Sequence, residues 1–252
     1  MEKVKTNIST IICFCAVFIA LQSCRKDPVF NCFVKNGDEI TVVREIGAPF
    51  ENIEIYGVID LEITQAPEYQ LRIEAGEHIE PQYTTRIENG TLIIDDESNC
   101  RAVRNFKRPK IYVSLPELKH LEYYGNGTVT NTGTLVTDRL TVDLWLGGEE
   151  VNLKVETDLM EGRIHGSSCD LVLSGRTNHL AVYKRGLGKL KAFDLSAQTC
   201  FVESYSSTDS EVTVNSILDA KLDFKGNLFY RGDPQLRDIR IRHEGRVKAV
   251  NK

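Results

Sequence analysis

The chain has 252 residues, and its 36 Asp and Glu outnumber 31 Lys and Arg, which gives a formal net charge of −5 at pH 7. That balance argues against the basic patch that nucleic-acid binding requires, so we expect no nucleic acid among its partners. The length suits one all-β domain with a sizeable core, or two small domains. No low-complexity segment, Pro/Ser-rich linker or block of like charges divides the chain.

Residues 1–23 have the layout of a secretory signal peptide. Lys3 and Lys5 precede an unbroken apolar run from Ile11 to Leu21, as in the charged and apolar regions of such peptides. The run is shorter than the about 20 residues that a membrane-spanning helix needs. We therefore expect the segment to be cleaved off.

The stretch LQSC, Leu21 to Cys24, is similar to a bacterial lipobox, although Gln22 departs from the small or apolar residue usual there. The motif predicts that Cys24 is acylated and becomes the first mature residue, with residues 24–40 as lipid anchor and tether. Stable anchoring takes two chains or signals at about 0.8 kcal/mol per buried methylene, which a multiply acylated cysteine supplies. The prediction is a cell-envelope protein anchored at the outer membrane, on its surface or its periplasmic face. An ordinary signal peptide with a chance cysteine is the alternative.

Four cysteines remain after the signal peptide and the lipidation site are set aside. Export permits disulfides, and Cys32 and Cys100 bracket the N-terminal strands in polar contexts, so we predict a bond between them. Its loop of about 69 residues would add roughly 4 kcal/mol in the chain-entropy model. Cys169 and Cys200 alternate with apolar neighbours and are expected to point inward as small hydrophobes.

Residues 41–116 form the predicted N-terminal β part. Short runs such as NIEIYG, IDLEITQ, YQLRIEAG and KIYVSLP alternate apolar and polar residues, which is typical of half-buried strands. Asn89-Gly90 lies between two such runs and favours a type I′ hairpin turn, because both residues tolerate positive φ. No convincing amphipathic helix follows the signal peptide.

Residues 117–252 repeat a unit of about 20 residues. The apolar pattern resumes after each Gly/Ser/Asp-rich turn at Val129, Val151, Leu171, Leu190, Val212, Leu228 and Val247. Two further rows keep the same spacing and are expected to point inward: Leu140, Met160, Leu180, Cys200 and Ala220, and Leu121, Val142, Gly162, Val182, Val202 and Leu222. Strands that repeat without helices predict an all-β, right-handed parallel β-helix in which each coil buries its face against its neighbours. An antiparallel sandwich with coincidental spacing is the alternative.

The spaced turns, the opening ENIEIYGVIDLEITQAPEYQLRIEAGEHIEP and the ending LFYRGDPQLRDIRIRHEGRVKAV resemble the head GIN domain family over Arg44 to Val250. Turns such as GGEE and SSTDSE depart from the family's usual Gly-Ser-Gly-Asp form. That family is described as auto-transporter adhesin heads and is found largely in lipoproteins and secreted proteins of Bacteroidetes-type bacteria. The resemblance implies a right-handed β-helix and a role in adhesion or recognition, and it carries no catalytic residues to transfer.

The sequence carries none of the common motifs of catalysis or cofactor binding. Phosphate-loop, zinc-protease, paired-cysteine and hydrolase-elbow motifs do not occur in the sequence, and the five histidines lack metal-ligand spacing. We therefore expect no enzyme, cofactor or metal. A polysaccharide lyase or hydrolase on a β-helix stays an alternative, but it needs carboxylates converging within about 10 Å, and the outward row Asp143, Arg163 and Glu203 alternates charge. A periplasmic sensor or structural partner is a second alternative.

One outward row is the predicted binding face. The positions three residues after the inward row that begins at Leu121 lie at the strand ends. They hold Tyr124, Trp145, His165, Arg185, Tyr205 and Lys225, and they are flanked by Tyr183 and Phe201. With coils about 4.8 Å apart, they would form a ladder roughly 24 Å long. We hypothesise that it binds a glycan or protein ligand, with Trp145 at its centre and Arg185 supplying charge. The alternative is that aromatic residues favour sheet surfaces and stack there for stability.

Overall fold

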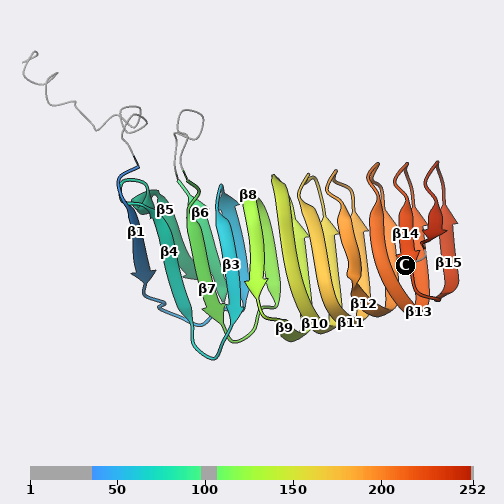
Figure 1. Cartoon of the computed structure of the whole chain (residues 1–252), viewed down its shortest axis with the longest axis horizontal. Coiled ribbons are helices and arrows are strands. Elements are labelled where there is room, and N and C mark those ends of the chain that lie inside the picture. The colour runs from blue at the N-terminus through green and yellow to red at the C-terminus, as the bar shows by residue number, and fades with distance from the viewer. Residues whose placement is uncertain (1–35, 98–106, 251–252) are drawn as a thin grey trace, which may run out of the picture. The chain divides into compact units, whose positions relative to one another are not determined.

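The computed structural model describes residues 36–97 and 107–250, and within them it is almost entirely β-structure (Figure 1). The first half contains β1 (Glu39–Arg44), β2 (Asn52–Gly57), β3 (Asp60–Gln65), β4 (Gln70–Gly76), the 3-10 helix η2 (Glu80–Gln82), β5 (Tyr83–Glu88), β6 (Thr91–Asp96), β7 (Lys110–Leu115) and β8 (His120–Thr132). The second half contains β9 (Leu135–Leu144), β10 (Gly148–Ile164), β11 (Asp170–Lys184), β12 (Leu190–Ser204), β13 (Ser210–Leu222), β14 (Leu228–Arg231), β15 (Gln235–Ile241) and β16 (Val247–Ala249).

From β8 onward every strand pairs in parallel with its neighbours. Val151 lies beside Leu171, and Met160 lies beside Leu180, so one coil takes about 20 residues. This register confirms the predicted parallel β-helix. Each coil buries its inner side against the coils before and after it, which is why the apolar rows recur at the repeat length.

The N-terminal strands pair differently. β1 with β4, β4 with β7 and β5 with β6 are antiparallel. The β5–β6 hairpin turns at Asn89 and Gly90, whose φ angles of 51° and 74° are both positive, as the predicted type I′ turn requires. β2 and β3 pair in parallel with β8, so the sheet passes from the N-terminal strands into the coils without a break.

The inward rows form the core. Leu140, Met160 and Val142 are fully buried, and burial of each such side chain contributes about 2 kcal/mol. Gly162 interrupts its row because a Cβ there would approach Leu171 Cδ2 to 2.7 Å. Every other position of these rows from β8 to β12 holds an apolar side chain.

The prediction that the two cysteines of the coils point inward is confirmed. Cys169 and Cys200 are buried free thiols. Burial raises the pKa of the Cys169 thiol to about 12, so this thiol stays protonated and packs as a small hydrophobe.

The prediction of the two inward rows is wrong at β13. Cys200 lies beside Leu218, and Val202 lies beside Ala220, where the even spacing predicted Ala220 and Leu222. β12 carries two register irregularities against β13, and these shorten the step between the two strands. An even repeat read along the sequence cannot locate such bulges.

Lys184 is a charged residue in an inward row, between Ile164 and Ser204. It is fully buried, and its Nζ donates hydrogen bonds at 2.7 Å to the carbonyls of Thr208 and Asp209 and at 3.2 Å to Ser210 Oγ. Burial lowers the pKa of Lys184 to about 8. The ammonium ties the end of β11 to the turn before β13.

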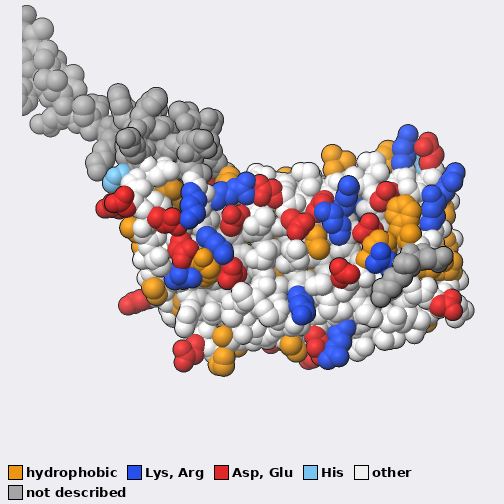
Figure 2. Space-filling model, viewed as in Figure 1, with side chains coloured by type: hydrophobic (Ala, Val, Ile, Leu, Met, Phe, Trp, Pro, Cys, Tyr) orange, Lys and Arg blue, Asp and Glu red, His pale blue; other side chains and the backbone are white. Residues whose placement is uncertain are grey.

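Charge pairs between neighbouring strands cover much of the outer surface. Lys110 Nζ lies 2.8 Å from a Glu62 oxygen, and Arg139 lies 2.6 Å from Glu161. Figure 2 shows acidic and basic side chains interspersed over the face in view. Cross-strand pairs of opposite charge each add a few tenths of a kcal/mol, so this surface is a charge-paired sheet exterior.

Candidate recognition surfaces

Six rings from successive coils line up at the strand ends, and we call them the aromatic ladder: Tyr56, Tyr124, Trp145, His165, Tyr183 and Tyr205. In the first half the rings are nearly parallel. Their centroids lie 4.7 Å apart for Tyr56 and Tyr124, 6.1 Å for Tyr124 and Trp145, and 3.7 Å for Trp145 and His165. The structure therefore brings the sequence-predicted residues together, with ring faces turned toward one another.

The second half of the ladder is tilted. Tyr183 makes interplanar angles of 49° with His165 and 55° with Tyr205, with centroids 6.0 Å apart in both pairs. The Arg185 guanidinium lies 5.8 Å from the centroid of the Tyr205 ring, within cation–π range.

The prediction that Lys225 is the last member of the ladder is wrong. The amide of Asp223 bonds Ser204 O, just as the amide of Tyr205 bonds Lys184 O. Asp223 therefore occupies the next register position, because the coil of β13 is shortened. Phe201, expected beside the ladder, instead has the Lys221 ammonium 5.1 Å from its ring centroid.

Glutamate carboxylates accept hydrogen bonds from the ladder rings. Each glutamate lies two residues before a ladder tyrosine, on the same face of its strand. Glu122 Oε2 accepts hydrogen bonds from Tyr124 Oη at 2.8 Å and from Trp145 Nε1 at 3.2 Å. Glu203 accepts from Tyr205 Oη at 2.8 Å, and Glu54 accepts from Tyr56 Oη. Burial together with the bond to Glu54 raises the pKa of Tyr56 to about 12. Each of these tyrosines is thus kept as a hydrogen-bond donor.

Asp143 fixes the centre of the ladder. Its buried carboxylate accepts hydrogen bonds from His165 Nε2 at 2.7 Å, from His120 Nε2 at 2.8 Å and from Arg163 at 3.3 Å. Burial opposes ionisation, but the two imidazole bonds together with the Arg163 charge outweigh it and lower the pKa of Asp143. The bond to Asp143 in turn raises the pKa of His120.

Sequence reasoning missed two parts of this surface. Tyr56 begins the ladder from the N-terminal β part, and the alternation of NIEIYG was the available signal because it turns Tyr56 outward. The turns after the ladder positions expose three apolar side chains, Leu146 at 59%, Leu187 at 64% and Phe224 at 43%. Together with the exposed Trp145 and Tyr205 they form the apolar crest.

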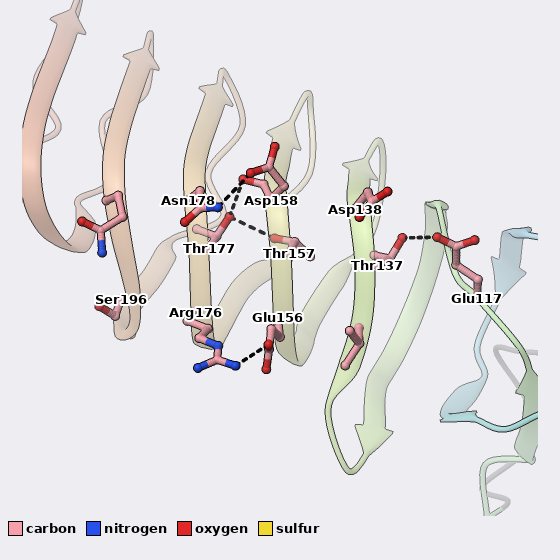
Figure 3. Close-up of a pocket in the computed structure, with 12 residues that line it drawn as sticks. Glu117, Thr137, Asp138, Glu156, Thr157, Asp158, Arg176, Thr177, Asn178 and Ser196 are labelled. Atoms are coloured by element: carbon pink, nitrogen blue, oxygen red, sulfur yellow. Dashed lines mark hydrogen bonds and ion pairs between the residues drawn. The ribbon is translucent and has the colours of Figure 1, made fainter.

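A second surface, the polar groove, crosses β9 to β12 before the strands reach the ladder (Figure 3). It has a volume of about 580 Å³. β9, β10 and β11 each contribute three consecutive residues, β12 contributes Ser196 and Gln198, and Glu117 lines one end. The third position of each coil, Asp138, Asp158, Asn178 and Gln198, is exposed. This groove could not be predicted from the sequence, because exposed polar residues on a sheet give no signal of concavity.

Three predicted site residues lie outside the described residues: Cys24, the predicted lipidation site, and Cys32 and Cys100, the predicted disulfide. Within residues 36–97 and 107–250, no helix is long and apolar enough to cross a membrane. The same residues contain no cluster of three or more His, Cys, Asp or Glu suited to a metal ion.

Comparison with known proteins gives a family and a fold. The family model described as "Putative auto-transporter adhesin, head GIN domain" matches residues 49–234. Solved structures named "putative adhesin" are similar, one from Bacteroides fragilis (23% identity, TM-score 0.79, covering 84% of this chain and 97% of that one) and one from Parabacteroides distasonis (18%, 0.63, 85% and 98%). A "putative lipid binding protein" from Parabacteroides distasonis is similar at 21% identity and TM-score 0.60, covering 86% of this chain and 98% of that one. These identities establish the fold alone, and no curated protein matches the chain.

Proposed function

Since this chain belongs to the head GIN domain family of auto-transporter adhesins, we propose that it is an adhesion protein of the cell envelope, attached through acylated Cys24 at the outer membrane. Its ligand binds to the aromatic ladder and the apolar crest. The observation that carries this proposal is the row of exposed apolar side chains at the strand ends and turns of four coils, from Trp145 and Leu146 through Leu187 and Tyr205 to Phe224.

Exposed apolar side chains gathered on one surface mark interaction sites on soluble proteins. The crest combines Trp, Tyr and Leu with Arg185 at its side, and Trp, Tyr and Arg are the residue types that dominate binding energy at protein interfaces. The carboxylates under the rings hold them in place before binding. Trp145 and Tyr205 of the crest are therefore ordered before a ligand binds, which lowers the entropic cost of association.

The ring geometry favours a protein ligand over a glycan on this surface. Tyr124, Trp145 and His165 turn their faces toward one another, with interplanar angles of 5° and 7°, so ring edges meet solvent. Sugars stack on exposed ring faces, whereas apolar side chains of a protein pack against ring edges and against Leu146 and Leu187.

The proposal contains no catalytic step. A glycosidase needs a protonated carboxylic acid with a raised pKa, but Asp143 in the outward row has its pKa lowered by its imidazole partners. Its oxygens are engaged by His120, His165 and Arg163.

An array of immobilised extracellular-matrix proteins tests the binding face, with Cys24→Ser as a soluble form of the chain. We expect binding to at least one protein and its loss in Leu146→Ser with Leu187→Ser, which leaves every ladder hydrogen bond intact. Trp145→Ala with Tyr205→Ala should also lose binding. The matched control is Val43→Ser, which removes an apolar side chain 74% exposed on β1. Binding that survives both crest and ladder variants contradicts the proposed face.

The anchor is tested separately, by metabolic labelling with a fatty-acid probe in a bacterium that carries out lipoprotein processing. We expect the wild-type chain to be labelled and membrane-bound, and Cys24→Ser to be unlabelled. Wild-type protein without label would remove the anchor from the proposal and leave the binding face untouched.

A further inference from the structure

The polar groove is built from one triplet repeated on four coils. The middle residues, Thr137, Thr157, Thr177 and Ala197, are buried. Thr137 Oγ1 donates to Glu117 at 2.6 Å, and Thr157 Oγ1 donates to Thr177 Oγ1 at 2.9 Å. This buried row fixes the backbone, so the flanking residues of each triplet are held at coil spacing, about 4.8 Å apart.

The flanking residues line the groove with donors and acceptors. Figure 3 shows Asp138, Asp158 and Asn178 side by side on three strands, with Glu156 and Arg176 paired below them. Asn178 Nδ2 donates to Asp158 Oδ1 at 2.8 Å. Within the described residues the Asp138 carboxylate has no hydrogen-bond partner, whereas the carboxylates of Glu122, Asp143 and Glu203 in the ladder each accept at least one hydrogen bond.

The charge and shape of the groove restrict its ligand. Four carboxylates, those of Glu117, Asp138, Glu156 and Asp158, face one guanidinium, that of Arg176, which disfavours an anionic ligand. The described residues offer no cluster suited to a metal ion. Val136 is 52% exposed at the rim, and Gln65 holds its backbone through bonds of 2.6 and 2.8 Å, so it provides a fixed apolar contact.

From this arrangement we infer that the polar groove binds an uncharged oligosaccharide lying across the coils. Sugar hydroxyls both donate and accept. The groove presents carboxylate acceptors and amides with both capacities in one row, and the Arg176 guanidinium, a donor, in the row beside it. The apolar CH surface of a pyranose packs on Val136. Solenoid coils provide extended concave surfaces of this kind. The groove is thus a second binding site, and it goes beyond the proposed crest.

The test uses the soluble Cys24→Ser chain on an array of cello-, manno-, malto- and chitohexaose, with a polygalacturonate hexasaccharide as the anionic comparison. We expect at least one neutral hexasaccharide to bind and the anionic one to fail. Asp138→Ala with Asp158→Ala and Asn178→Ala should weaken binding at least tenfold. Val136→Lys, which fills the rim and leaves the triplet hydrogen bonds intact, should do the same.

Two controls separate this site from the crest. Asp233→Ala removes an exposed carboxylate outside the groove and should leave binding unchanged, as should Leu146→Ser with Leu187→Ser. Absence of any neutral hexasaccharide, binding unaffected by both groove variants, or loss of sugar binding in the crest variant would each overturn the inference. Matrix-protein binding that depends on the crest would stand in all three cases, because it is measured on a different array.

Discussion

The aromatic ladder and the polar groove share the coils of β9 to β12, but two of the four groove carboxylates, those of Asp138 and Asp158, are left exposed. In the ladder Glu122, Asp143 and Glu203 all accept hydrogen bonds from ring residues of the protein itself. In the groove Asp138 accepts none from the described residues, and Asp158 accepts one, from Asn178.

The ladder is therefore an apolar surface whose rings are held in place before a ligand binds, whereas the groove is a polar surface whose groups are open to solvent. Carboxylates that are already engaged have little left to offer a ligand, but they hold the rings for contact with apolar groups. Carboxylates that face solvent in a concave groove exchange water for ligand hydroxyls at small cost. One repeating fold therefore presents two surfaces of different chemistry along the same coils.

The sharpest test of this contrast removes one carboxylate from each surface. Asp143→Ala leaves two imidazoles and the Arg163 guanidinium without their shared acceptor, and breaking a buried charge pair costs about 3 kcal/mol. Asp138→Ala should change the free energy of unfolding by less than about 0.5 kcal/mol, as is usual for surface substitutions. Urea unfolding of both variants measures the two values. Equal losses would show that the two surfaces do not differ as described.

Truncation of one apolar side chain on each surface gives a smaller difference. Trp145 is stacked on both sides and bonded to Glu122, so Trp145→Ala should lower the free energy of unfolding by about 2 kcal/mol, less than a core Trp because the ring is partly exposed. Val136→Ala at the groove rim should cost less than about 0.5 kcal/mol. Thermal unfolding at one protein concentration compares them. A Trp145 variant as stable as wild type would mean that the ring stack contributes nothing to the fold.

The fold was predictable because its signal repeats. The inward rows, the outward ladder from Tyr124 to Tyr205 and the turn at Asn89-Gly90 all follow from spacing, and many coils give the same answer. Lys184 shows the limit of this reasoning: its position lies in an inward row, but nothing in the local sequence reveals that three acceptors in the next turn satisfy its ammonium.

The errors and omissions share a physical cause, which is that they depend on contacts between coils. The shift that replaces Lys225 by Asp223 comes from bulges in β12 against β13. Tyr56 joins the ladder because β2 stacks on β8, a pairing across more than sixty intervening residues. The groove likewise takes its lining from four neighbouring strands, and no single triplet encodes it.

The coupling of two ladder rings should be measurable as a pairwise free energy. A double-mutant cycle with Tyr124→Leu and Trp145→Leu should give about 1 kcal/mol, because their rings are parallel within 5° and aromatic pairs add about that much beyond area burial. Val136→Ala combined with Asn178→Ala in the groove provides the comparison, and its effects should add within about 0.3–0.5 kcal/mol. If the effects of Tyr124→Leu and Trp145→Leu are also additive, the two rings do not stabilise each other.

The smallest expected effect depends on pH and comes from His120, whose pKa the bond to Asp143 raises. A raised folded-state pKa gives stability that is full below the unfolded value of about 6.5 and is lost as the pH rises through the folded value. Asp143, with a lowered pKa, stays ionised from pH 5 to 9 and keeps its own contribution there. His120→Gln should therefore destabilise by about 1 kcal/mol more at pH 5.5 than at pH 8.5, a modest value because the imidazole is partly exposed. Urea unfolding across this range measures the difference, with His179→Gln, whose ring bonds the Thr199 hydroxyl, as the matched control. If the His120 and His179 profiles run parallel, the bond to Asp143 does not couple protonation to the stability of the ladder.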